Sequence, residues 1–436
     1  MVQLLLLACA VLNAAAWTQS PPPPLGTPTP QQLAWHDLEV GMFIHLAPQT
    51  WQDSEWDSGK TPLTDINPDK LDTEQWASVA QAMGARYIVF VAKHEGGFCW
   101  WPSAATDYSV KSIPWRGGTG DVMADLSASC RKRGLGLGVY LSPQDKHFGA
   151  AVGGKTKDPA KQSEYEKMFR TQLTELLTGY GDMMEVWFDG SLVFDVGDLV
   201  EKHAPKAVVF QGPRASIRWV GNEEGIAPYP AWNAVKFGKK KWGDYTAEDG
   251  DPAGDRWLPN ECDARIRATW FWHTDNADTL KTVPQLMDMY DKSVGRGAVL
   301  LLNATPDRTG LIPAADAARA AEFGAEVLRQ FETPLASTSG KGAEIVVQPS
   351  AAATIDRALV MEDIRKGERV RRYVLEGEVG GEWKVLVEGS AIGHKRIDRF
   401  VPLEVTRVRL RVLEAVGEPV IRTLAIYRAA AEAPAK

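Results

Sequence analysis

Short apolar runs alternate with helical patterns from about residue 36 to residue 332, and this alternation limits the fold more than any other feature of the chain. Runs of this length, rich in β-branched and aromatic residues, are typical of buried strands. Strands that are apolar along their whole length and separated by helices form a parallel sheet covered on both faces. The predicted strands lie at 41–46, 86–92, 135–142, 185–190, 207–212, 265–273 and 298–303.

The number of these units distinguishes a barrel from an open sheet. Seven strands are defined by their pattern, and an eighth is expected in a stretch whose pattern is unclear. About 300 residues of strand–helix units favour a (β/α)8 barrel over an open doubly wound sheet. No GxGxxG or GxxxxGK[ST] motif follows any of the runs, which excludes the two commonest nucleotide-binding sites. We therefore predict an α/β chain with a (β/α)8-like barrel over residues 36–332.

The pattern changes near residue 333. From there to about residue 428, apolar and polar residues alternate with a period of two, turn residues separate the runs, and no long helical pattern is found. This arrangement predicts an antiparallel β-sandwich over residues 333–428. Residues 429–436 are expected to form a disordered tail.

The N-terminal segment has the features of a secretion signal. Residues 1–16 contain an apolar run too short to span a bilayer, followed by small residues suited to cleavage near Ala16. Residues 17–35 are expected to form a Pro-rich spacer, which is non-helical over residues 18–30. The mature protein is therefore expected to be soluble and secreted or periplasmic, with no membrane partner. A lipoprotein site at Cys9 is the alternative.

Charge and cysteine content limit the partners further. The chain has 49 Lys and Arg against 56 Asp and Glu, a formal net charge of −7. Nucleic-acid binding requires clustered positive charge, so no such partner is expected. Beyond Cys9, the remaining cysteines, Cys99, Cys130 and Cys262, are far apart and are expected to be free, buried thiols.

Ionisable residues stand at the ends of four successive predicted strands, where (β/α)8 enzymes carry their active sites. They are His45, His94, Glu95, Tyr140, Asp145 and Asp189. A single polar residue at a strand end is usually a loop cap. Four strands that deliver such groups to one rim favour a functional site.

Asp189 is the strongest candidate for a catalytic role. It ends the segment Trp187-Phe188-Asp189-Gly190, and a carboxylate framed by aromatic residues suits attack on an anomeric carbon, with a second carboxyl as acid/base. We predict Glu223 as that acid/base, because a glycine-flanked loop can carry it back over Asp189 and Trp219 can desolvate it. Glu261 and Glu224 are the alternatives.

Motifs of other enzyme classes are missing from the sequence. It has no HxH, HExxH or GxSxG motif, so neither a catalytic metal nor a nucleophilic serine is expected.

Several motifs together resemble the α-L-fucosidases of glycoside hydrolase family 29. They are Gly41-Met42-Phe43-Ile44-His45, Trp76, Lys93-His94-Glu95-Gly96-Gly97-Phe98, Trp101-Pro102-Ser103, Thr106-Asp107-Tyr108, Trp187-Phe188-Asp189-Gly190 and Ile392-Gly393-His394-Lys395-Arg396-Ile397. The resemblance implies a retaining, cofactor-free hydrolase that releases terminal α-L-fucose from a fucosylated oligosaccharide or glycoconjugate, with Asp189 as nucleophile.

The resemblance also implies the residues that bind the sugar and the subgroup of the family. The substrate-binding residues are expected to be His45, Glu55, Trp56, His94, Glu95, Tyr140, Asp145, Arg218 and Trp272, and Trp101 and Trp270 are further candidates for an aromatic wall. At residues 94–96 a His-His-Asp run is replaced by His-Glu-Gly. With Asn222-Glu223 and residues 259–263, this departure is similar to the subgroup that prefers branched α-1,3/1,4-linked fucose. A retaining glycosidase for another sugar and an inactive glycan-binding protein are the alternative functions.

Overall fold

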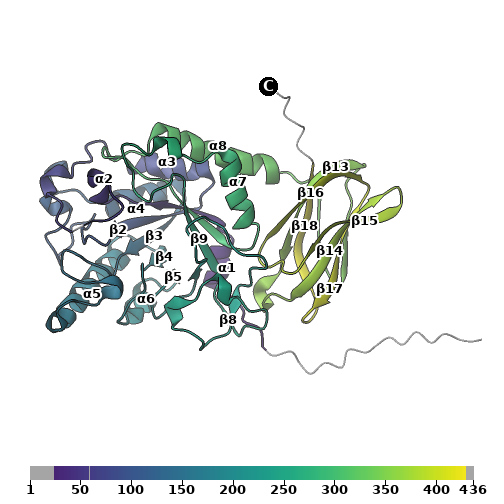
Figure 1. The fold of residues 1–436 in the computed structure, drawn as a ribbon, viewed down its shortest axis with the longest axis horizontal. Coiled ribbons are helices and arrows are strands. Elements are labelled where there is room, and N and C mark those ends of the chain that lie inside the picture. The colour runs from purple at the N-terminus through teal and green to yellow at the C-terminus, as the bar shows by residue number, and fades with distance from the viewer. Residues whose placement is uncertain (1–23, 58, 429–436) are drawn as a thin grey trace, which may run out of the picture.

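The computed structural model describes residues 24–57 and 59–428, so the predicted signal peptide and the C-terminal tail lie outside the described residues. An eight-stranded parallel sheet is followed by two antiparallel sheets (Figure 1). The predicted fold class, a (β/α)8-like barrel followed by a β-sandwich, is confirmed.

The parallel sheet curves into a nearly closed barrel in the order β5-β4-β3-β2-β1-β10-β9-β6. A single parallel bridge between Phe210 and Ile217 joins its two edge strands. The strands are β1 (Val40–Ile44), β2 (Tyr87–Lys93), β3 (Gly136–Leu141), β4 (Met183–Trp187), β5 (Val208–Phe210), β6 (Arg218–Trp219), β9 (Asn260–Arg265) and β10 (Val299–Asn303), while β7 (Ala234–Val235) and β8 (Arg256–Trp257) form a separate hairpin.

Two strands differ from their predicted positions. The eighth strand is β6, which has only two residues and therefore carries no periodic pattern. The strand predicted at 265–273 instead ends at Arg265, and residues 266–273 form an irregular loop. Their aromatic residues gave this loop the composition of a strand, although two of them, Trp270 and Phe271, line the pocket described below.

Helices cover the outside of the barrel (Figure 1). The first helix begins at Pro30, where the predicted non-helical stretch ends, and covers the last residues of the predicted spacer. Thr29 caps it by accepting a hydrogen bond from the backbone N–H of Gln32, and Pro30 occupies the first turn, where its missing N–H costs nothing. The helices are α1 (Pro30–His36), α2 (Gln49–Gln52), α3 (Thr73–Met83), α4 (Val122–Arg133), α5 (Gln162–Gly179), α6 (Gly197–His203), α7 (Val283–Lys292) and α8 (Ala314–Phe331). None of these described helices is long and apolar enough to cross a membrane.

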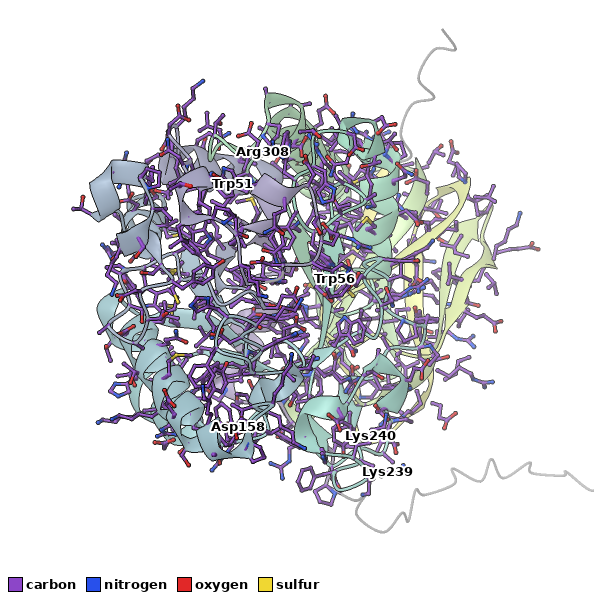
Figure 2. The ribbon with its side chains drawn as sticks, turned by 60° about the vertical axis from the view of Figure 1, so that its left-hand side comes forward. Trp51, Trp56, Asp158, Lys239, Lys240 and Arg308 are labelled. Atoms are coloured by element: carbon purple, nitrogen blue, oxygen red, sulfur yellow. The ribbon has the colours of Figure 1, made fainter. Side chains whose placement is uncertain are left out.

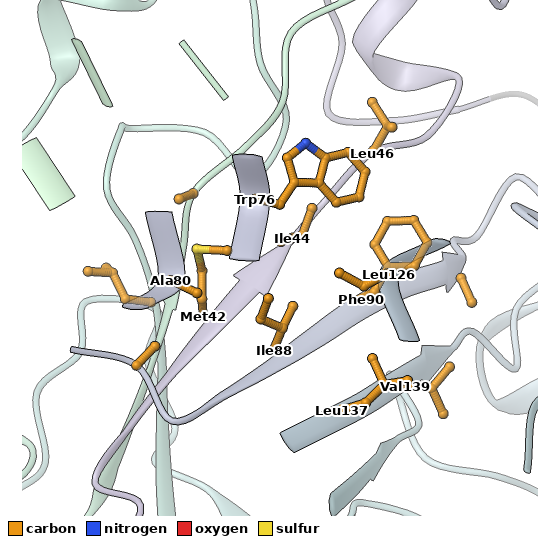
Figure 3. Packing of buried hydrophobic residues seen from close by; sticks show 14 of the residues in the cluster. Met42, Ile44, Leu46, Trp76, Ala80, Ile88, Phe90, Leu126, Leu137 and Val139 are labelled. Atoms are coloured by element: carbon orange, nitrogen blue, oxygen red, sulfur yellow. The ribbon is translucent and has the colours of Figure 1, made fainter. Parts of the chain in front are cut away.

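The layer between the sheet and its helices is a continuous apolar core. Trp76 of α3 is fully buried there and lies beside Ile44 and Leu46 (Figure 3). Its ring centroid is 5.7 Å from that of Phe90, and its indole N–H donates to the carbonyl of Gly310 at 2.9 Å.

We expect Trp76→Ala to lower the free energy of unfolding by about 3–5 kcal/mol. The substitution leaves a cavity in the core and removes the hydrogen-bond donor to the Gly310 carbonyl. Chemical denaturation measures this loss. Trp56→Ala is the matched control: Trp56 is 74% exposed, so its removal should change stability by less than about 0.5 kcal/mol. Equal losses in both variants would contradict the packing described for Trp76.

The second domain consists of two four-stranded antiparallel sheets with apolar side chains between them. One sheet has the order β11-β18-β13-β16 and the other β12-β17-β14-β15. The strands are β11 (Ala336–Lys341), β12 (Glu344–Val347), β13 (Ala353–Glu362), β14 (Val370–Val379), β15 (Glu382–Gly389), β16 (Arg396–Val405), β17 (Val408–Ala415) and β18 (Val420–Arg428).

Polar contacts fasten the sandwich to the barrel. The buried carboxylate of Glu368 accepts from the backbone N–H of Asn233 at 3.0 Å and from its side-chain amide at 2.9 Å. Asn233 in turn accepts from the backbone N–H of Asn260, the first residue of β9. At another point His394 contacts Asp37, with 2.8 Å between Nε2 and Oδ1. The start of β9 is therefore tied to the sandwich.

Candidate active site

A pocket of about 380 Å³ opens at the carboxyl ends of the barrel strands. This volume lies in the range of small-molecule sites. Its lining combines aromatic rings with ionisable groups: Phe43, His45, Glu55, Trp56, His94, Tyr140, Trp187, Asp189, Phe210, Gln211, Trp219, Glu223, Asp263, Arg265, Trp270 and Phe271. The pocket thus brings together seven of the predicted site residues: His45, Glu55, Trp56, His94, Tyr140, Asp189 and Glu223.

Asp189 follows the end of β4, with its carboxylate facing the pocket. The hydroxyl of Tyr140 donates to its Oδ2 at 3.0 Å. Tyr140 stacks on Trp187, which stacks on Phe210 with 3.7 Å between ring centroids. The enclosing protein raises the pKa of Asp189, while the hydrogen bond from Tyr140 opposes this effect by stabilising the charged form. The carboxylate is therefore held in one orientation by a rigid aromatic stack.

Two histidines supply opposite hydrogen-bonding atoms to the pocket. Asn303 donates its amide to the carbonyl of Trp270, so its Oδ1 is the atom that faces His45 Nδ1 at 2.9 Å. His45 therefore carries its proton on Nδ1 and presents Nε2 as an acceptor. Gln49 donates to Nδ1 of His94 at 2.8 Å, so His94 presents a protonated Nε2. Burial lowers the pKa of both rings, that of His45 to about 3, which keeps them neutral.

The loop that carries Glu55 and Trp56 forms one side of the pocket mouth. The carboxylate of Glu55 accepts from the backbone N–H groups of Trp270 and Phe271 at 2.8 and 3.1 Å. Trp56 projects into solvent, with the ammonium of Lys146 at 5.8 Å from its ring centroid, and is labelled near the middle of the molecule in Figure 2. Glu55 thus joins the loop to residues 270–271, and Trp56 stays available as an exposed platform.

Glu95 and Gly96, in the His-Glu-Gly sequence at residues 94–96, contact the loop that carries Trp56. Glu95 does not line the pocket. Its carboxylate accepts from the backbone N–H of Asp57 at 3.0 Å and pairs with Lys146 at 2.7 Å. A Cβ on Gly96 would lie 2.0 Å from the Asp57 carboxylate, so no side chain fits there. Glu95 therefore supports the Trp56 loop, and Gly96 leaves room for it.

Glu223 lies on the loop after β6 and lines the same pocket as Asp189. Its carboxylate is paired with the guanidinium of Arg265 at 3.1 Å, and its side chain is 45% exposed. Trp219 therefore does not shield the Glu223 carboxylate from solvent as predicted, because solvent and a cation both reach it. The adjacent Glu224 is exposed and its backbone bridges to Ala264.

Glu261, the alternative acid/base, lies inside the barrel beneath Trp187. Its Oε1 accepts from the indole N–H of Trp187 at 2.8 Å, and the side chain is fully buried. Burial and the neighbouring Glu185 raise the pKa of Glu261, and burial raises that of Glu185 to about 7. Trp187 therefore separates Glu261 from the pocket, where an acid/base would have to act.

Three other predicted binding residues also lie outside the pocket lining. Asp145 is buried against Lys93 at 3.1 Å, and Trp272 packs against the guanidinium of Arg308 at 5.7 Å. Arg218 is turned toward the start of β9, where it donates to Asn260 at 2.8 Å and to the carbonyl of Leu258. Each of these three side chains therefore contacts other residues of the protein instead of the pocket. Trp101, a candidate wall, is likewise buried.

Asp263 and Arg265 are pocket residues that sequence reasoning missed. They alternate with small residues in Glu261-Cys262-Asp263-Ala264-Arg265, which is the period of a strand with charged side chains on one face. Placing the strand at 265–273 hid this pattern. Within residues 24–57 and 59–428, no three His, Cys, Asp or Glu side chains are grouped to hold a metal ion.

A barrel whose aromatic-walled pocket at the strand ends holds four carboxyl groups, Asp189 and Glu223 among them, belongs to the class of glycoside hydrolases. The family model described as alpha-L-fucosidase matches residues 27–328, and the chain belongs to this family. It is 35% identical to alpha-L-fucosidase 1 of Arabidopsis thaliana, over 93% of this chain and 88% of that protein.

Two solved structures extend the comparison to three dimensions. A putative alpha-L-fucosidase of Bacteroides thetaiotaomicron has a TM-score of 0.88 and 34% identity, over 93% of this chain and all of that chain. A Ruminococcus gnavus fucosidase in complex with fucose has a TM-score of 0.83 and 27% identity, over 96% and 98% of the two chains. The protein is thus an α-L-fucosidase by family, with a fucosylated glycan as its class of substrate.

Proposed function

We propose that the protein is a retaining exo-α-L-fucosidase in which Asp189 is the nucleophile and Glu223 the acid/base. The observation that carries the proposal is that the Asp189 carboxylate, oriented by Tyr140, shares one pocket with Glu223 while Glu261 is closed off by Trp187. A retaining enzyme requires two carboxyl groups in one site, one for attack and one for proton transfer.

The reaction proceeds in two displacements. Asp189 Oδ attacks the anomeric carbon of the fucosyl unit as Glu223 protonates the glycosidic oxygen, so the bond to the leaving sugar breaks and a fucosyl-Asp189 ester forms. Glu223 then takes a proton from water, which attacks the same carbon and releases fucose with its original anomeric configuration.

The two histidines suit recognition of a sugar hydroxyl. Their rings lie 5.9 Å apart between centroids, one presenting an acceptor and the other a donor. A hydroxyl is both donor and acceptor, so one hydroxyl of fucose can satisfy both. The 6-methyl group of fucose requires apolar contact, which the aromatic rings of the pocket provide.

We further propose that the protein prefers branched glycans with α-1,3- or α-1,4-linked fucose. The support is the loop geometry: Glu95 and Gly96 hold the loop that exposes Trp56 beside the mouth of the pocket. An exposed indole offers a platform for a sugar ring beyond the fucose. A branched glycan presents such a second ring next to the leaving group.

A panel of fucosylated oligosaccharides tests this function. We expect free fucose from branched α-1,3- and α-1,4-linked trisaccharides, at rates about fivefold above those for α-1,2- and α-1,6-linked or aryl fucosides, because one favourable ring contact is worth about 1 kcal/mol. Trp56→Ala should reduce this preference without abolishing release. Equal rates on all linkages would contradict the linkage proposal. Release of galactose or xylose but not fucose would contradict the fucosidase proposal itself.

We also propose that the protein acts outside the cytoplasm, after cleavage of residues 1–16. The composition of that segment supports this proposal. Mass spectrometry of the protein purified from its native host would identify the mature N-terminus.

A further inference from the structure

One wall of the pocket carries polar atoms that no described residue satisfies. They are Nε1 of Trp219, Oδ1 of Asp263 and Nε of Arg265, each shielded from solvent and without a hydrogen-bond partner among residues 24–57 and 59–428. The opposite wall differs, since His45, His94 and Tyr140 all have partners there. A buried polar atom left unpaired costs about 1–3 kcal/mol. An arrangement of this kind suits a ligand that brings the missing partners.

Asp263 is the most buried ionisable group on this wall of the pocket. It is 4% exposed, whereas the side chains of Arg265 and Glu223 are 24% and 45% exposed. The guanidinium of Arg265 pairs with Glu223, and no Lys, Arg or His in the described part of the chain pairs with Asp263. Asp263 and Asp189 line the same pocket, and the fucosyl unit must lie against Asp189 for attack.

Titratable groups on several strands surround Asp263. They are Glu261 and Arg265 on its own strand, Cys262 on the outer face, Glu223 after β6, Asp189 after β4 and His45 after β1. The facing residue of β10, Leu301, is apolar. Asp263 is thus a buried carboxyl among other carboxyl groups, while the nearest cation on its strand is engaged by Glu223. Neighbouring carboxyl groups in one pocket raise each other's pKa, so they do not all ionise together.

We propose that Asp263 acts as an uncharged carboxylic acid whose O–H donates a hydrogen bond to an oxygen of the bound fucosyl unit. This inference rests on the proposed function, since it concerns the sugar held beside Asp189. Only the protonated form of a carboxyl can donate. A sugar oxygen in the pocket supplies the acceptor that the protein does not.

The proposal has a direct consequence for pH dependence. Burial, reinforced by Glu223 and Asp189 and opposed by the neighbouring Trp219 indole and the backbone, raises the pKa of Asp263 to about 8. The donor is therefore present below about pH 8 and is lost above it, when a carboxylate in the same place would repel the sugar oxygen. A group with this pKa passes from mostly protonated at about pH 7 to about one-tenth protonated at about pH 9. Binding and turnover should fall about tenfold over that interval.

Asp263→Asn tests this directly, because an amide keeps a donor and cannot ionise. We expect the ratio of its kcat/KM to that of wild type to rise about tenfold between about pH 7 and pH 9. Asp263→Ala, which lacks a donor, should lose about tenfold at about pH 7. L-fucose binding to the wild-type protein, followed by tryptophan fluorescence, should weaken over the same pH range.

Glu362→Gln is the matched control. Glu362 is a buried carboxyl of the sandwich whose pKa burial also raises to about 8, but it belongs to β13 and does not line the pocket. Its variant should keep the wild-type pH profile. The inference is overturned if Asp263→Asn keeps the wild-type alkaline loss, or if L-fucose affinity does not change between about pH 7 and 9. If wild type releases no fucose at any pH, the proposed function fails instead.

Discussion

Asp189→Ala should reduce fucose release from a branched trisaccharide by at least about 10³-fold, because no other group can form the covalent intermediate. The fold should not change, since the only side-chain hydrogen bond that Asp189 makes with described residues is the one from Tyr140. The measurement is the initial rate of fucose release, with a thermal melt of the same preparation. Near-wild-type turnover by a folded variant would refute the nucleophile assignment.

Asp182→Ala is the control for this experiment. Asp182 precedes the same strand but is exposed, and pairs only with Lys206 on the surface. Its loss should leave the rate unchanged, because exposed ion pairs contribute little. Proton NMR of the wild-type reaction adds an independent test: the α-anomer of fucose should appear first, and the β-anomer first would exclude a double displacement.

Glu223→Ala should lose about 10²–10⁴-fold on natural glycans, which need a protonated leaving group. It should lose much less on fucosides whose leaving group departs unaided. Azide should accelerate that residual reaction, because the small anion can enter the space of the missing carboxyl and attack the fucosyl-enzyme. The comparison of glycan and activated substrate, with and without azide, is the measurement.

Glu261 and Glu224 provide the controls for this assignment. Glu261→Gln keeps an acceptor for Trp187, so it should show no azide rescue. Glu224→Ala should behave like wild type, because the Glu224 side chain is exposed. Azide rescue of Glu261→Ala but not of Glu223→Ala would reverse the assignment, and Glu223 would then serve only as the partner of Arg265.

The elements that sequence reasoning predicted well are those that bury a long apolar face. The strands β2 and β10 are apolar up to their last residue, because helices cover one face and the barrel interior the other. Each therefore appears in the sequence as an unbroken apolar run. The two-residue strand β6 carries no such signal. It exists because β9 provides a backbone to pair with, which is a contact across about 40 residues that no local pattern encodes.

The same distinction explains the site. His45, His94 and Asp189 were predictable because each lies at the end of a predicted strand, within two residues of where the observed strand ends. Glu55 reaches the pocket through hydrogen bonds to residues 270 and 271, more than 200 positions away in the sequence. Asp145 failed as a pocket residue because a buried Lys93 neutralises it. Strand ends place a side chain near the rim, but the partner it finds there depends on loop packing.

The attachment of the sandwich through Glu368, Asn233 and Asn260 makes the two domains poor candidates for modular exchange. Cutting the chain after α8 would leave Asn233 without the Glu368 carboxylate that orients it. Asn233 contacts the first residue of β9, the strand that carries Asp263 and Arg265. An engineer who wishes to append a different accessory domain should therefore keep residues 333–428 and build outward from the far end of the sandwich.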